Sequence, residues 1–79
     1  MDERLSSVLA DVFGMRAADI HPGLAKGDVA SWDSLKQMDL VMSLEREYGI
    51  TLEIIDIVAM TSVAAIVEVL AAKGASVGN

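Results

Sequence analysis

The sequence predicts a single all-α domain, a four-helix bundle with a long loop between the first and second helices and a short third helix. Apolar residues make up 53% of the 79 residues but aromatic residues only 4%, so the core must be built from aliphatic side chains. Such a composition suits packed helices better than sheets. Apolar residues also recur at helical spacing along the chain. We expect one domain over residues 1–79, with helices at about 3–13, 34–48, 54–59 and 62–73 and a frayed tail at 75–79.

The first helix is predicted from an apolar stripe that follows the i, i+3, i+4, i+7, i+8 spacing of one helical face. The stripe consists of Leu5, Val8, Leu9, Val12 and Phe13. Gly14 is suited to a left-handed cap that ends this helix. Residues 15–32 then show no sustained periodicity, and a loop of this length in a small domain is usually functional or disordered. Four residues are expected to anchor it: Ile20, Leu24, Val29 and Trp32.

The second helix is expected from Ser34 to Tyr48, with Asp33 as its N-cap and Gly49 as its stop. At about 100° per residue, Leu40, Leu44 and Tyr48 form a core stripe. A separate apolar strip begins beside Ser34 and consists of Leu35, Met38 and Met42. The strip has two interpretations, a wide buried stripe or an exposed surface for protein docking. Methionine suits the second because its flexible side chain repacks against different partners.

The segment 54–60 is apolar and rich in β-branched residues, so it is either a short helix or a buried strand. A helix is favoured because no other segment offers a strand partner. We expect its apolar residues to close the core, ahead of lining a cargo cavity or contacting a dedicated partner: Ile54, Ile55, Ile57 and Val58. The last helix is predicted after Thr61 or Ser62 as N-cap, with Lys73 and Gly74 at its end.

Charge and composition exclude several functional classes. A net charge of −6 argues against nucleic-acid binding, which needs clustered basic residues, and favours basic protein surfaces as partners. The chain has no cysteine, which excludes disulfides, a thiolate metal site and a catalytic thiol of its own. No apolar run approaches the roughly 18 residues of a membrane span, and the acidic start at Met1 is unlike a signal peptide. We therefore expect a cytoplasmic monomer without a metal site.

The residues Trp32-Asp33-Ser34-Leu35 resemble the acyl carrier protein family, in which an Asp-Ser-Leu tripeptide opens the second helix. The likeness runs from about Leu5 to Lys73 and includes the long first loop and three further segments. These are Leu40-Val41-Met42-Ser43-Leu44-Glu45, Tyr48-Gly49-Ile50 and Thr61-Ser62-Val63. The resemblance implies a four-helix bundle of acyl-carrier type that is not an enzyme and has no catalytic residues.

The resemblance also implies a cofactor. Ser34 matches the serine that receives 4'-phosphopantetheine from coenzyme A through a separate phosphopantetheinyl transferase, and Asp33 and Leu35 flank it. A phosphate suits this position because a helix N-terminus offers free amides and the positive end of its dipole. The arm ends in the thiol that the chain lacks, which would hold acyl groups as thioesters.

Further positions match those that the family uses for docking to acyl-loading and acyl-processing enzymes. They are Leu35, Met38, Asp39, Met42 and Glu45. Lys36 and Arg46 depart from the acidic or neutral residues usual in fatty-acid carriers, which puts binding to generic basic patches in doubt. Trp32 resembles carriers of specialised pathways, such as polyketide or lipid biosynthesis, although its expected role is to anchor the loop.

Three alternatives remain at this stage. A hydrolase would need a base for Ser34, and the sequence offers only His21 and no Gly-x-Ser-x-Gly elbow. An unmodified acidic adaptor explains the charge and periodicity equally well, but not a serine at the head of the docking helix. An aminoacyl or peptidyl carrier from a modular synthase is the third, and Met1 just before the first helix favours a free-standing protein over it.

Overall fold

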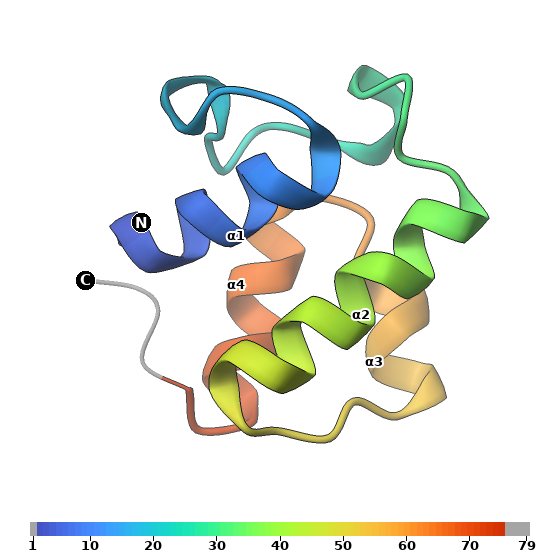
Figure 1. Ribbon diagram of the computed structural model, residues 1–79. Coiled ribbons are helices and arrows are strands. Elements are labelled where there is room, and N and C mark those ends of the chain that lie inside the picture. The colour runs from blue at the N-terminus through green and yellow to red at the C-terminus, as the bar shows by residue number, and fades with distance from the viewer. Residues whose placement is uncertain (1, 76–79) are drawn as a thin grey trace.

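In the computed structural model, which describes residues 2–75, four helices pack into an acyl-carrier-type bundle (Figure 1). The helices are α1 (Glu3–Phe13), α2 (Ser34–Tyr48), α3 (Ile54–Ala59) and α4 (Val63–Ala72). Two short 3-10 turns, Ala17–Asp19 and Lys26–Asp28, lie in the long loop, and no β-strand occurs within residues 2–75. The all-α prediction is therefore confirmed. Residues 76–79 of the expected tail lie outside the described residues.

Helix boundaries follow from the capping residues. Gly14 and Gly49 adopt left-handed conformations with φ of 67° and 64° and end α1 and α2, as expected. Ser62, rather than Thr61, caps α4, because its Oγ accepts a hydrogen bond from the amide of Ala65 at 3.0 Å. Since Ser62 and Lys73 are themselves the caps, α4 is one residue shorter at each end than its predicted range.

The core is mostly aliphatic, as the composition predicts, and also contains Phe13 and Trp32. Its fully buried side chains come from α1, α2, α4 and the α3–α4 junction: Leu5, Leu9, Leu40, Leu44, Met60, Val63, Ile66 and Leu70. Burying each of these side chains contributes about 1.5–3 kcal/mol relative to leaving it exposed. No helix among the described residues is long and apolar enough to cross a membrane.

The long loop runs across one end of the bundle (Figure 1) and is held there by its own apolar residues and by α4. All four expected anchors are buried: Ile20, Leu24, Val29 and Trp32. The amides of Val63 and Ala64, at the start of α4, donate to the carbonyl oxygens of Leu24 and Pro22 at 2.9 and 3.0 Å. The loop therefore satisfies helix amides that would otherwise lack partners.

The expectation that the apolar residues of α3 close the core was wrong for three of the four. Ile54, Ile55 and Val58 are 79%, 75% and 70% exposed, and α3 contributes no buried residue of its own. The reason is geometric: a helix of six residues has fewer than two turns, so only one narrow face reaches the core. Ile57 and the following Met60 occupy that face.

Polar contacts tie α3 to its neighbours. Lys73 Nζ, at the end of α4, lies 2.9 Å from Asp56 Oδ2 and 3.6 Å from Glu53 Oε1. The hydrogen bond with Lys73 lowers the pKa of Asp56, and the same contact raises the pKa of Lys73. Both shifts favour the charged forms, so the pair keeps its ionic character across the neutral pH range.

Candidate functional site

The start of α2 presents an accessible hydroxyl. Asp33 is the N-cap, and its Oδ1 accepts a hydrogen bond from the amide of Lys36 at 2.8 Å. Ser34 is therefore the first helical residue, and it is exposed. Within the described residues, neither its hydroxyl nor the amides of Ser34 and Leu35 have a hydrogen-bond partner. A nucleophilic oxygen thus lies beside free amides at the positive end of the helix dipole.

The segment that leads to Ser34 is fixed against α1. Ser31 Oγ donates to the carbonyl oxygen of Phe13 at 3.2 Å. The Trp32 ring packs on Phe13 with 4.5 Å between ring centroids, and only 3% of Trp32 is exposed. Its predicted role as a loop anchor is therefore confirmed.

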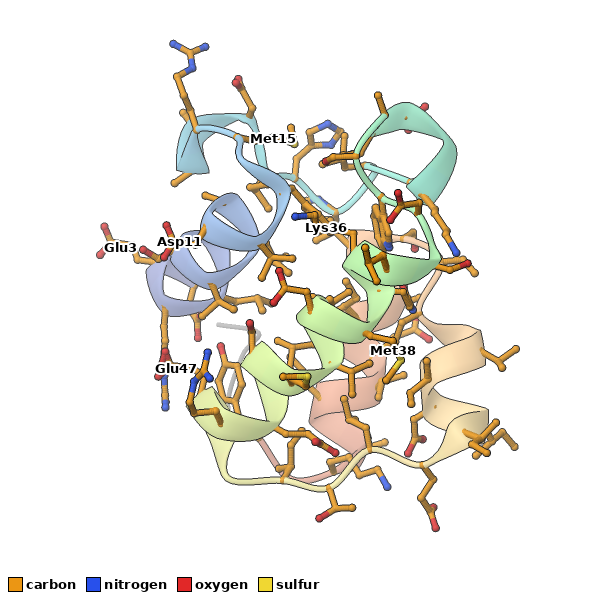
Figure 2. All side chains as sticks on the ribbon, turned by 45° about the vertical axis from the view of Figure 1, so that its right-hand side comes forward. Glu3, Asp11, Met15, Lys36, Met38 and Glu47 are labelled. Atoms are coloured by element: carbon orange, nitrogen blue, oxygen red, sulfur yellow. The ribbon has the colours of Figure 1, made fainter. Side chains whose placement is uncertain are left out.

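The apolar strip of α2 is exposed. Leu35, Met38 and Met42 are 83%, 51% and 57% exposed, so the interpretation as a wide buried stripe was wrong. Figure 2 shows Met38 on the side of α2 that faces α3, and Lys36 on the other side. The three strip residues line a shallow groove together with Ser31, Asp33, Lys36 and Asp39.

The predicted polar docking residues do not all lie together. Asp39 is exposed and lines the groove, with its Oδ2 3.9 Å from Lys36 Nζ. Glu45 lies outside the groove and is half-buried. Its Oε2 accepts a hydrogen bond from the amide of Leu52 at 2.8 Å, which ties α2 to the segment before α3. Arg46 is exposed, one turn beyond Met42.

One residue near the site was missed by the sequence reasoning. Gln37 is only 8% exposed and is the buried polar residue of α2. At about 100° per residue it falls on the same arc as Leu40 and Tyr48, within the core stripe. A glutamine in an otherwise apolar stripe is the signal that could have identified it, because buried amides need partners.

A protein-family model described as the phosphopantetheine attachment site matches residues 3–70 of the chain. The chain belongs to this family. It is a carrier protein of the acyl carrier family, with 4'-phosphopantetheine as its covalently attached prosthetic group. Carrier domains of this kind are generally non-catalytic and interact with modifying and acyl-processing enzymes.

The start of α2 fits that prosthetic group. The exposed Ser34 hydroxyl can form a phosphodiester, and the free amides of Ser34 and Leu35 suit its negative charge. The apolar strip of Leu35, Met38 and Met42 lies beside it in the shallow groove. The chain itself has no cysteine.

Proposed function

We propose that this carrier holds acyl intermediates as thioesters on an arm attached to Ser34 Oγ, and that it presents them to partner enzymes without catalysing a reaction itself. The observation that supports this most strongly is the exposed hydroxyl of the first residue of α2, beside two amides without partners in the described residues. The family match favours such a carrier over an unmodified adaptor.

The chain's own residues would have distinct roles. Asp33 sets the start of α2 by capping the Lys36 amide, and thereby puts Ser34 at the outermost position of the helix. The amides of Ser34 and Leu35 would stabilise the phosphate charge by about 0.3–1 kcal/mol, the usual value for an anion at a helix N-terminus. The prosthetic group supplies the thiol that forms thioesters.

The attachment site is tested by incubating the carrier with coenzyme A and a broad-specificity phosphopantetheinyl transferase. We expect the wild-type mass to increase by one phosphopantetheine, and Ser34→Ala to prevent the increase. Ser43→Ala, a serine of the same helix that lies away from its start, is the matched control and should be modified at the wild-type rate. An unmodified wild type, or a modified Ser34→Ala, would contradict the proposal.

We further propose that partner enzymes dock on the apolar strip of Leu35, Met38 and Met42, with Asp39 beside it in the groove and Glu45 as a docking residue outside the groove. Exposed apolar side chains beside an attachment site support this, because such patches mark interaction surfaces.

A negative charge at the strip should weaken docking without unfolding the carrier. We expect Met42→Glu to lower kcat/KM of acyl-loading enzymes by about tenfold, with a melting temperature within a few degrees of wild type. An unchanged kcat/KM would exclude the strip as the docking surface.

We also propose the type of biosynthetic pathway in which the carrier acts. Lys36 and Arg46 on α2, together with Trp32, favour a specialised polyketide, lipid or related pathway over housekeeping fatty-acid synthesis. The assay with Met42→Glu should therefore include an acyltransferase of fatty-acid synthesis and one of polyketide synthesis. A preference of the wild-type carrier for the fatty-acid enzyme would contradict the specialised assignment.

A further inference from the structure

The buried side chain of Gln37 links three segments of the carrier. Its Oε1 accepts a hydrogen bond from Trp32 Nε1 at 2.6 Å. Its Nε2 donates to the carbonyl oxygens of Ile57 at 3.0 Å and Met60 at 3.3 Å. Both ends of the side-chain amide are thus engaged, with one bond accepted and two donated. One side chain of α2 therefore holds the end of the long loop and the end of α3.

The hydrogen bond between Gln37 and Trp32 connects α2 to the segment just before the proposed attachment site. Trp32 precedes Ser34 by two residues and is the only tryptophan of the chain. Its ring rests on Phe13, and its buried indole N–H needs an acceptor, which Gln37 provides. Gln37 therefore fixes the backbone before Ser34 relative to α2.

The other end of the network holds α3. The carbonyls of Ile57 and Met60 lie at the C-terminal end of α3, and the carbonyl of Ile57 also accepts a hydrogen bond from the amide of Met60 at 3.2 Å. Helix α3 contributes no buried side chain of its own, and three of its apolar residues face outward. The two bonds from Gln37 therefore hold the C-terminal end of α3 together with the buried side chain of Met60.

We propose that Gln37 is a positioning residue for the modification of Ser34, an inference that rests on the function proposed for that serine. Its amide couples the backbone of residues 32–34 to the docked position of α3, so that the transferase meets a preformed surface. Without the amide, the indole N–H and two carbonyls lose a partner, and α3 opens more often. When a smaller fraction of the carrier is in the conformation that the transferase binds, KM for the carrier rises and kcat stays largely unchanged.

The test uses Gln37→Met, which keeps the length of the side chain but removes its hydrogen bonds. We expect the single indole N–H resonance of Trp32 to shift, and amide exchange at Met60 to accelerate by about tenfold or more. Exchange at Leu9 and Leu44, in the core of α1 and α2, should change far less. In the transferase reaction, KM for the carrier should rise about fivefold with kcat within about twofold. Unchanged exchange at Met60, or an unchanged KM in the folded variant, would overturn the proposal.

Two further variants separate positioning from general destabilisation. Glu68→Met makes a similar exchange at an exposed position of α4 and should leave both KM and the indole resonance unchanged. Trp32→Phe removes the indole donor together with part of the buried ring, and it leaves the bonds from Gln37 to α3 in place. It should raise KM while exchange at Met60 stays near wild type. If Gln37→Met fails to fold, Trp32→Phe still tests the proposal. An unchanged KM for the Trp32→Phe carrier would contradict the coupling through Gln37.

These experiments also separate a failure of the positioning role of Gln37 from a failure of the function proposed for Ser34. If the wild-type carrier is not modified at all, the assignment of Ser34 fails. In that case the indole resonance and the exchange at Met60 still test whether Gln37 links Trp32 to α3. If the wild type is modified but KM is insensitive to Gln37→Met, the function stands and the positioning role is excluded.

Discussion

A serine lies at the start of both α2 and α4, but it is the first helical residue of α2 and the N-cap of α4. At α4, Ser62 is itself the N-cap, and its hydroxyl is occupied by the amide of Ala65. The amides of Val63 and Ala64 donate to carbonyls of the long loop. The hydroxyl of Ser62 and the first amides of α4 are therefore engaged within the protein.

At α2 the capping role belongs to Asp33, so Ser34 lies one position further along, as the first helical residue. Its hydroxyl and the amides of Ser34 and Leu35 have no partner among the described residues. The residue after Ser34, Leu35, is 83% exposed, whereas the residue after Ser62, Val63, is fully buried. The comparison shows that a serine at a helix start stays exposed when another residue caps the helix and no loop covers it.

The largest expected effect comes from placing a charge at the residue after each serine. Val63→Asp buries an unpaired carboxylate in the core and should destabilise the carrier by about 4 kcal/mol or more. Leu35→Asp puts the same charge into solvent and should change the free energy of unfolding by less than about 0.5 kcal/mol. Urea denaturation followed by circular dichroism measures both. Similar losses in the two variants would refute the contrast between a covered and an open helix start.

A smaller effect is expected when the serines themselves are replaced. Ser62→Ala removes an N-cap hydrogen bond and should destabilise the carrier by about 1 kcal/mol while leaving modification intact. Ser34→Ala should cost less than about 0.5 kcal/mol, because the hydroxyl of Ser34 has no bond to lose within the described residues. Thermal unfolding of the two variants in parallel provides the measurement. A larger loss for Ser34→Ala than for Ser62→Ala would indicate that Ser34 has a structural role.

Much of this contrast could be predicted from local sequence. Asp33 and Ser62 are residue types that cap helices, and Gly14 and Gly49 are suited to end them, so the helix boundaries follow from short-range hydrogen bonding. Helical periodicity also separated the buried stripe of α2 from the strip that begins at Leu35.

Other features depend on which segments meet in space. The exposure of Ile54, Ile55 and Val58 could not be deduced from their hydrophobicity, because it depends on how short α3 is and which face it presents to α2 and α4. Likewise Gln37 shows its role only through Trp32 and the end of α3, which it contacts. Glu45 matches a docking position in sequence, yet its bond to Leu52 engages it within the fold.

The sequence by itself determined the helical class, the caps, the family and the serine at the head of α2, because these depend on residue type and on neighbours within a few positions. Only the tertiary structure decided which polar groups are free. Whether an amide, a hydroxyl or an apolar face is available depends on what distant segments cover it, as the long loop covers the start of α4 and leaves Ser34 open.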